Sequence, residues 1–447
     1  MKKVILVLGC MVWLGMGSQG NADLAFTPVT PCRIIDTRGS GPIVMGTTRD
    51  FLVTGTTGFD SQGGNLGGCG IPDDATSVMI NFIAVGPTAP GDLRAWPFGG
   101  VMPNASIINF ASVPGLNIAN GLIQPICNPA VATCTSDLTV FAEGSDVHLV
   151  ADVTGYFGVR TPVTVTVNCP GQSLQASVDA AGAGDVINVT GTCIENVVIR
   201  EEKQRLTLDG QNAAILNGPS SLPTLNVKGK GILIQNFYNS GAITGGTVGI
   251  YVNRNASATI NHNNIHNTGA SGISINQLSF AVIKNNNIHD NPGSGIYVYE
   301  NSDARIGFDS TADSTSSPNT IQNNGDRGIT VTQTSHATIV GNTIASNGSD
   351  GIGVFRLSSA DIASNTINGN GASGVNVSNN SSVNLGEDTP ADFFDQPNIT
   401  TVYNGAFGIN CSLGGSVKAH LGSQYQINGT SGQTSISTTC PNSIVTP

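Results

Sequence analysis

The stretch Gly249-Ile250-Tyr251-Val252 returns as Gly295-Ile296-Tyr297-Val298, and close variants of it recur through the second half of the chain. Seven glycines open these phrases: Gly249, Gly272, Gly295, Gly328, Gly351, Gly374 and Gly408. They are 23, 23, 33, 23, 23 and 34 residues apart, so the repeat is 23 residues long with insertions of 10 and 11 residues in two units. A fixed period of this length is typical of stacked, repetitive folds.

Within each unit, counted from its glycine as position 0, aliphatic residues occupy fixed places. Positions 1 and 3 are aliphatic around a mixed position 2, which is the alternation of a short half-buried strand. Position 9 is mostly alanine, and positions 11 and 16 are aliphatic again. Because one coil cannot bury these side chains alone, the coils must stack on one another. The repeat therefore predicts an all-β fold, a parallel β-helix of 23-residue coils with three short strands in each coil.

Position 14 of the repeat carries asparagine in five units: Asn263, Asn286, Asn319, Asn342 and Asn365. Stacked asparagines can form a ladder of side-chain amides, and asparagine tolerates the left-handed backbone of a tight turn. We expect such a ladder inside the coil.

The composition and the N-terminus indicate an exported protein. Charged residues make up 11% of the chain and the net charge is -11, which does not favour nucleic acid or an anionic membrane surface as partner. Two lysines and an apolar run precede small residues near position 22, so residues 1–22 are expected to be a signal peptide. Lipidation at Cys10 is the alternative. No later segment is long and apolar enough to span a bilayer, and a monomer is expected.

Eight cysteines follow the expected signal peptide, an even number that suits an oxidising compartment. We expect disulfides between cysteines close in sequence, which would fix each end of the stack, with zinc binding as the alternative. The expected pairs are Cys32–Cys69, Cys127–Cys134, Cys169–Cys193 and Cys411–Cys440.

Residues 23–160 lack the 23-residue period and predict a separate β-rich, sandwich-like domain with strands near 77–84, 105–110, 137–141 and 147–157. The segment opens on Cys32-Arg33-Ile34-Ile35-Asp36-Thr37-Arg38 and closes on Asp152-Val153-Thr154-Gly155-Tyr156-Phe157. With these phrases it resembles an accessory module of secreted bacterial proteins. We expect a buried pair between arginine and aspartate of the opening phrase to brace it.

Residues 161–170 are expected to link this domain to the repeats of 171–447. Residues 173–181 predict an amphipathic helix, capped by Ser173, that covers the open end of the stack. Helical lid and repeat together resemble the right-handed parallel β-helix superfamily over residues 170–430. That superfamily includes pectate and pectin lyases, alginate epimerases, pectinesterases, phage tailspikes and periplasmic accessory proteins of copper-enzyme maturation. The resemblance implies that ligands bind on the face of the opening strands.

Three sets of polar or aromatic residues are candidates for function. Aromatic rings beside arginine and glutamate suit sugar rings and uronate carboxylates, which gives a candidate carbohydrate site on the opening strands. Its members are Tyr251, Arg254, Tyr297, Tyr299, Glu300, Phe355 and Arg356. His266 and His289 occupy one repeat position in consecutive coils and should lie about 5 Å apart. With Asp290 they are candidates for metal binding or acid–base work, and a structural turn is the alternative.

The two insertions are acidic and form the third candidate, a calcium site, with solvated loops as the alternative. Their carboxylates are Asp309 and Asp313 in the first, and Glu387, Asp388, Asp392 and Asp395 in the second. A lyase or epimerase would need a cation and a base, for which Arg254, Lys284, Arg305 or Arg356 and Tyr297, His289 or Asp290 come into question, but no complete catalytic set stands out.

The sequence thus predicts a protein that is secreted, or lies at the cell surface or in the periplasm, and that binds an acidic polysaccharide or cell-surface glycan, which it could also process. Two alternatives remain: a non-catalytic structural or adhesive surface protein, and a periplasmic accessory protein of copper-enzyme maturation.

Overall fold

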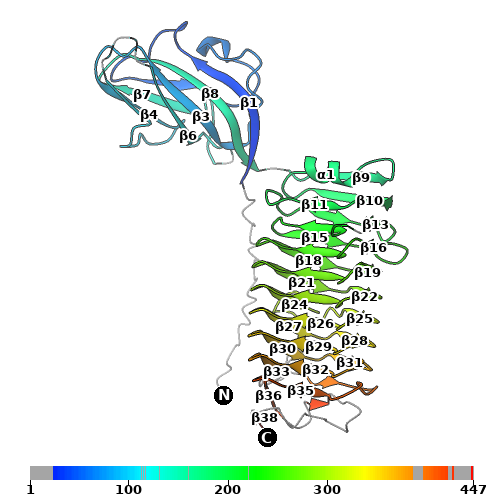
Figure 1. Cartoon of the computed structure of the whole chain (residues 1–447). Coiled ribbons are helices and arrows are strands. Elements are labelled where there is room, and N and C mark those ends of the chain that lie inside the picture. The colour runs from blue at the N-terminus through cyan, green and yellow to red at the C-terminus, as the bar shows by residue number, and fades with distance from the viewer. Residues whose placement is uncertain are drawn as a thin grey trace, which may run out of the picture. The chain divides into compact units, whose positions relative to one another are not determined.

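The computed structural model describes residues 24–420, apart from 112, 114, 116, 130, 160, 220 and 386–395, together with 425–426 and 444–445. The expected signal peptide, Cys10 and the acidic residues of the second insertion lie outside the described residues. The chain forms two compact units that divide between Thr161 and Pro162, and each is described by itself (Figure 1). No helix in the described part of the chain is long and apolar enough to cross a membrane.

The first unit contains two four-stranded antiparallel sheets and a short 3-10 helix, η1 (Asp60–Gln62). One sheet has the order β1 (Leu24–Asp36), β8 (His148–Val159), β3 (Ala75–Val85), β6 (Asn117–Pro125), and the other β2 (Thr48–Phe51), β7 (Leu138–Glu143), β4 (Gly91–Pro97), β5 (Ile108–Phe110). Alternate side chains of both sheets, among them Phe82 of β3 and Leu138 of β7, share one hydrophobic core. The all-β unit without the repeat is therefore present as predicted.

The second unit is a solenoid of parallel strands in which each coil adds one strand to each of three sheets. The first sheet holds the opening strands of the repeat. It consists of β11 (Val197–Ile199), β14 (Leu225–Val227), β17 (Ile250–Val252), β20 (Ile273–Ile275), β23 (Ile296–Val298), β26 (Ile329–Val331), β29 (Ile352–Val354), β32 (Val375–Val377) and β35 (Ile409–Cys411).

The second sheet carries positions 8 to 12 of the repeat. It consists of β9 (Thr164–Cys169), β10 (Val186–Cys193), β12 (Thr207–Asp209), β15 (Ile232–Gln235), β18 (Ser257–Asn261), β21 (Phe280–Lys284), β24 (Asp303–Ile306), β27 (His336–Val340), β30 (Ser359–Ala363), β33 (Ser382–Leu385), β36 (Ser416–His420) and β38 (Ile444–Val445).

The third sheet carries positions 15 to 17 and begins with the end of β10. It continues through β13 (Ile215–Gly218), β16 (Ala242–Gly245), β19 (Asn264–His266), β22 (Asn287–His289), β25 (Thr320–Gln322), β28 (Thr343–Ala345), β31 (Thr366–Asn368), β34 (Asn398–Ile399) and β37 (Tyr425–Gln426). Register is kept from coil to coil, so that Ile250 pairs with Ile273 and Ile273 with Ile296. The predicted aliphatic positions form one continuous core inside the coil.

Three buried side-chain ladders run along the solenoid. The predicted asparagine ladder forms: each amide donates to the next, as from Asn319 Nδ2 to Asn342 Oδ1 at 2.9 Å, and it extends to Asn398. A second asparagine ladder, which the sequence analysis missed, runs through Asn291, Asn324, Asn347, Asn370 and Asn404. A third ladder has serine hydroxyls accepting from backbone N–H groups of the preceding coil, through Ser279, Ser302, Ser335, Ser358 and Ser381. Together they satisfy polar groups that the turns bury.

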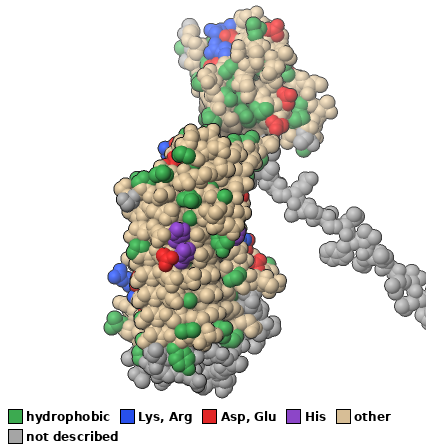
Figure 2. Space-filling model, turned by 90° about the vertical axis from the view of Figure 1, so that its right-hand side faces the viewer, with side chains coloured by type: hydrophobic (Ala, Val, Ile, Leu, Met, Phe, Trp, Pro, Cys, Tyr) green, Lys and Arg blue, Asp and Glu red, His purple; other side chains and the backbone are tan. Residues whose placement is uncertain are grey.

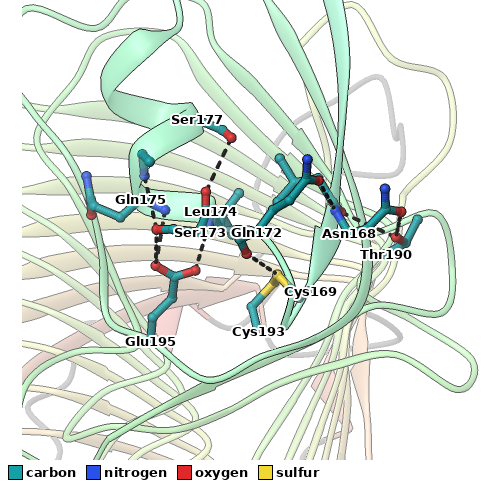
Figure 3. The surroundings of a disulfide bond; sticks show 12 residues. Asn168, Cys169, Gln172, Ser173, Leu174, Gln175, Ser177, Thr190, Cys193 and Glu195 are labelled. Carbon is teal, nitrogen blue, oxygen red and sulfur yellow. Dashed lines mark hydrogen bonds between the residues drawn. A yellow bond between two sulfur atoms is a disulfide. The ribbon is translucent and has the colours of Figure 1, made fainter.

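The predicted lid is present as α1 (Leu174–Ala180), which buries Leu174 and Val178 against the first coils. Figure 3 shows how its N-terminus is fixed. Glu195 accepts hydrogen bonds from Ser173 Oγ, Leu174 N and Gln175 N at 3.0, 2.6 and 3.2 Å. The disulfide between Cys169 and Cys193 lies beside this contact. A carboxylate at the positive end of a helix is favourable, so the lid is held electrostatically as well as covalently.

Three of the four expected disulfides are present: Cys32–Cys69, Cys127–Cys134 and Cys169–Cys193. Cys411 is buried in β35, and Cys440, its expected partner, lies outside the described residues.

Candidate functional site

A cleft of about 450 Å³ lies on the outward face of the first sheet. Its floor is made by small side chains, notably Thr330 and Thr332 of the coil that contains β26. Tyr297 stands on one side and Phe355 on the other, two coils further along the stack. Both rings are partly exposed. Since neighbouring coils stack about 4.8 Å apart, the coils that carry Tyr297 and Phe355 are about 10 Å apart, with one coil between them.

Arg327 organises the Phe355 side of the cleft. Its guanidinium lies over the Phe355 ring at 4.7 Å from the ring centroid, a cation–π contact. Its Nε donates to Asp350 Oδ2 at 3.0 Å, and Nη1 lies 3.3 Å from Asp326 Oδ2. The Asp350 side chain is only 4% exposed, whereas that of Asp326 is 44% exposed. One carboxylate therefore anchors the arginine and the other faces the cleft.

Further hydrogen bonds fix the two carboxylates. Asp350 also accepts from Ser373 N at 3.1 Å and from Asn376 Nδ2 at 3.0 Å. Asp326 accepts from Ser294 Oγ at 3.2 Å. A network whose members are each held by several partners is rigid, so the polar groups of the cleft are preorganised.

Gly353 makes room for this arrangement. A Cβ at this position would lie 2.4 Å from Phe355 Cε2 and 2.7 Å from Arg327 Cδ, closer than any ordinary contact. The ring and the guanidinium therefore occupy space that only glycine leaves free.

An aromatic and polar network adjoins the cleft. The Tyr299 ring packs against Tyr297 with centroids 4.6 Å apart, and its hydroxyl meets Tyr251 Oη at 3.4 Å. Burial raises the pKa of Tyr299, and its contact with Tyr251 raises it further. Asn276 donates to Tyr251 Oη at 2.9 Å and to Glu300 Oε2 at 3.1 Å. Tyr299 is therefore uncharged and supports Tyr297 from beside the cleft.

Two predicted arginines have different surroundings. Arg356 is exposed at the cleft rim, in a turn where its backbone has a φ of 54°. It pairs with no carboxylate among the described residues. Arg254, also in the left-handed turn, lies 3.3 Å from Glu201 of an earlier coil. Tyr297, Phe355 and Arg356 thus line one cleft, Tyr251, Tyr299 and Glu300 adjoin it, and Arg254 is engaged elsewhere.

Sequence reasoning missed Asp326, Arg327 and Asp350, which come just before the repeat glycines. Arg327 and Asp350 stand directly before the glycine, at a position that holds Ser271, Ser294 and Ser373 in three other coils, and Asp326 is one residue earlier. Two consecutive charged residues of opposite sign in a row of serines were the available signal.

The predicted histidine pair lies on the third sheet, away from Tyr297. The rings of His266 and His289 stack with centroids 4.9 Å apart, close to the expected spacing. His289 contacts Asp290 Oδ2 through Nδ1 at 2.7 Å and Asn264 Oδ1 through Nε2 at 2.9 Å. Burial lowers the pKa of His266, and the neighbouring His289 lowers it further. Figure 2 shows two histidine side chains side by side, next to an acidic one, in the middle of the viewed face of the solenoid. Both nitrogens of His289 are engaged, which favours the structural alternative.

Among the described residues, one group of three ligand atoms lies close enough for a metal: Cys169, Cys193 and Glu195. The two sulfurs are bonded to each other and Glu195 caps α1, so this group is structural. In the first insertion, Asp313 accepts from Asp309 N and Ser310 N, which lowers its pKa. Lys284 pairs with Asp309, so these carboxylates already have partners. The second insertion lies outside the described residues.

In the first unit, the two quoted phrases lie on the paired strands β1 and β8. Arg33 donates to both carboxylate oxygens of Asp152 at 2.9 and 3.2 Å, and Nη1 reaches Asp36 at 3.3 Å. Arg38 donates to Asp36 in turn, which lowers the pKa of Asp36 to about 2. The expected bracing pair exists, but it is not buried, since the Arg33 side chain is 41% exposed. The pair is exposed because Arg33 of β1 and Asp152 of β8 point away from the hydrophobic core of the first unit.

Comparisons with known proteins bear on the second unit. Residues 185–389 match the family described as "Right handed beta helix region". No curated protein sequence matches the chain. Solved structures with similarity include pectate lyase Pel9A, with 14% identity over 60% of this chain and 78% of that one, and a TM-score of 0.33. The A-module of the mannuronan C-5 epimerase AlgE6 of Azotobacter vinelandii is 17% identical over 64% of this chain and 89% of its own, with a TM-score of 0.33.

The catalytic unit of a GH87 alpha-1,3-glucanase of Streptomyces thermodiastaticus is 13% identical over 92% of this chain and 97% of its own, with a TM-score of 0.28. These similarities are too distant to transfer an activity. The family match over residues 185–389 and the three parallel sheets agree, however, and the second unit is a right-handed β-helix of repeated coils.

Proposed function

We propose that the cleft on the first sheet binds an extracellular polysaccharide. The observation that carries the proposal is the pair of aromatic side chains, Tyr297 and Phe355, which line the cleft from coils about 10 Å apart with threonines between them. Aromatic faces stack well on the apolar faces of sugar rings, and the space between them suits one or two such rings. Between the walls, the partly exposed Asp326 carboxylate offers hydrogen-bond acceptors for sugar hydroxyls.

Among the described charged residues of the cleft, Arg356 is the one that an acidic polysaccharide is expected to contact. Arg327 is balanced by Asp326 and Asp350, so it has no charge to spare for a ligand. Arg356 pairs with no described carboxylate and stands at the rim. A uronate carboxylate is therefore expected to meet Arg356, while its ring stacks on Phe355. The three disulfides suit the oxidising, extracytoplasmic setting in which such glycans occur.

The test is calorimetric titration of oligogalacturonate and alginate oligomers, with neutral gluco-oligosaccharides alongside. Phe355→Ala should weaken binding about fivefold to twelvefold, because about 40–60 Å² of apolar contact at about 25 cal/mol per Å² is worth about 1–1.5 kcal/mol. Arg356→Ala should weaken acidic oligomers selectively. Gly353→Ala should act like Phe355→Ala, since its methyl group displaces the ring.

The second sheet supplies a matched control, because Arg305 lies over the Phe280 ring at 5.5 Å in the same kind of contact. Phe280→Ala and Arg305→Ala should leave binding unchanged. Absence of heat for every oligomer at millimolar concentration would refute the proposal and leave the structural or adhesive alternative. If Phe280→Ala and Arg305→Ala lower the affinity as much as Phe355→Ala and Arg356→Ala do, the cleft is not the binding site.

A further inference from the structure

Aromatic and small residues alternate along the outward row of the first sheet. This row is position 2 of the repeat, the middle residue of each opening strand. Tyr251 pairs with Ser274, which pairs with Tyr297 of the next coil. Tyr297 pairs in turn with Thr330, which pairs with Gly353. A tyrosine ring therefore stands on every second coil as far as Tyr297, with a small side chain on the coil between.

Phe355 continues this period where Gly353 leaves the place empty. Its ring leans back over Gly353, because a Cβ there would lie 2.4 Å from Phe355 Cε2 and 2.6 Å from Cζ. Beyond the two ends the row holds asparagines, since Asn226 precedes Tyr251 and Asn376 follows Gly353. The three partly exposed rings, named here the ring row, thus span five coils, or about 19 Å at a spacing of about 4.8 Å.

Tyr299 makes the aromatic surface continuous between the first two rings of the row. Its ring packs on Tyr297 of the same coil with centroids 4.6 Å apart, and its hydroxyl meets Tyr251 Oη, two coils away, at 3.4 Å. Asn276, which is 2% exposed, lies on the coil between them and donates to Tyr251 Oη at 2.9 Å. Rings that are held by one another and by a buried amide lose little freedom when a ligand binds.

Polysaccharides differ in how they present their sugar faces to such a row. In a chain of equatorial 1,4-linkages the sugar rings lie nearly flat along the chain, and each sugar is turned over relative to the next. Every second sugar therefore offers the same face, and the length of one sugar is close to the strand spacing of about 4.8 Å. An axial bond in the linkage tilts the sugars, so their faces do not fall on one line. Aromatic side chains bind these flat faces.

We infer that the ring row, Tyr251, Tyr297 and Phe355, binds a uronan with equatorial 1,4-linkages along the axis of the solenoid. Each coil takes one sugar, and every second sugar stacks on a ring. The inference rests on the proposed function of the cleft and adds the linkage, direction and length of the bound chain. The cleft then takes three sugars, one on each wall and one between them, and the surface from Tyr297 to Tyr251 takes two more.

The charges along the ring row place short chains in the cleft. Arg356 is exposed at the cleft end. Towards the other end Arg254 is held by Glu201 at 3.3 Å, and Glu300 adds an exposed carboxylate. The attraction for a uronate is therefore strongest at the cleft end. A uronan of three sugars is expected to bind there, whereas one of six sugars also reaches Tyr251.

Calorimetric titration of the full chain with β-1,4-linked oligoglucuronates of three and six sugars tests the inference. The α-1,4-linked oligoglucuronates of the same lengths are titrated alongside, because they have the same sugar and charge and differ in linkage alone. The β-linked hexamer should bind about fivefold more tightly than the β-linked trimer, since it stacks on one more ring. It should also bind at least about fivefold more tightly than the α-linked hexamer, which cannot stack on all three rings.

Tyr251→Ala should weaken the β-linked hexamer about fivefold and leave the trimer unchanged, whereas Phe355→Ala should weaken both. Tyr251→Phe keeps the ring and should restore the affinity that Tyr251→Ala loses. Tyr238→Ala is the matched control, because this half-buried tyrosine stacks on His262 at 4.2 Å in the turn between β15 and β16, off the first sheet. It should bind the hexamer like the wild type.

Two results overturn the inference and leave the proposed function standing. One is equal affinity for the α-linked and β-linked hexamers. The other is a Tyr251→Ala variant that binds the hexamer like the wild type while Phe355→Ala weakens the trimer. If no oligomer of either linkage binds, the inference and the proposed function both fail.

Discussion

The asparagine ladder makes a sharp prediction about Asn342. This side chain is 1% exposed. Its Oδ1 accepts from Asn319 N at 3.1 Å and from Asn319 Nδ2 at 2.9 Å. Its Nδ2 donates to Ile306 O, Val340 O and Asn365 Oδ1 at 2.9, 3.1 and 3.1 Å. The buried residue thus joins three consecutive coils.

Asn342→Ala leaves the Asn319 N–H and Nδ2 without their shared acceptor and removes one donor from each of three oxygens, Ile306 O, Val340 O and Asn365 Oδ1. A buried unsatisfied group costs about 1–3 kcal/mol, and the cavity adds to it, so we expect a loss of about 3 kcal/mol in the free energy of unfolding. Asn342→Asp should cost more at neutral pH, because a carboxylate would face three acceptors with no donor for them.

Urea unfolding of the full chain measures the loss, with circular dichroism as signal and the slope checked for two-state behaviour. Hydrogen exchange at the Asn319 amide reports the local effect. The control is Asn287→Ala, whose half-buried side chain donates one bond to Asn264 Oδ1 at 3.1 Å and whose loss should cost about 1 kcal/mol or less. Equal costs for Asn342→Ala and Asn287→Ala, with Asn319 protection unchanged, would contradict the reasoning.

Two further predictions concern the bracing contacts of each unit. Because the Arg38 hydrogen bond lowers the pKa of Asp36 from 3.8 to about 2, the stabilisation is present above pH 3.8 and is lost as the pH falls towards 2. Asp36→Asn should remove this acid dependence, worth about 1 kcal/mol or less for an exposed pair, as followed by the fluorescence of Trp96 in the first unit. Replacing Cys169 and Cys193 by alanine opens a loop of 24 residues and should cost about 3 kcal/mol. Hydrogen exchange should then rise first in α1, and an unchanged α1 would argue against its role as a fastened lid.

The periodic part of the fold could be predicted because each buried position repeats in every coil. An isoleucine or valine at the same position of six coils predicts a buried position more strongly than a single residue does. The strands β17 to β32 lie where the register of the repeat predicts them. The second asparagine ladder was missed for the opposite reason. Asn291, Asn324, Asn347 and Asn370 follow the third sheet among other turn residues, and the sequence does not tell an inward asparagine from an outward one.

The site could be predicted only in part because its contacts run between coils. Tyr297, Phe355 and Arg356 stand out as large residues on an outward row, and the structure brings them to one cleft. The engagement of Arg254 by Glu201 depends on a turn outside the repeat, which no register describes. The engagement of His289 by Asn264 likewise depends on side-chain rotation rather than on spacing.

The cleft arises where the repeat is broken. Serine precedes the glycine in three coils, but Arg327 and Asp350 replace it in two adjacent ones and pair across the stack. At position 2, tyrosine gives way to Thr330 and then to Gly353, which lowers the floor and leaves space for the Phe355 ring. None of these changes disturbs the aliphatic core, because Thr330 and Gly353 are the outward residues of β26 and β29, and Arg327, Asp350 and Phe355 lie in the turns that flank these strands. The solenoid can therefore acquire a binding surface at little cost in stability, and in such a fold the departures from the repeat are the residues to test for function.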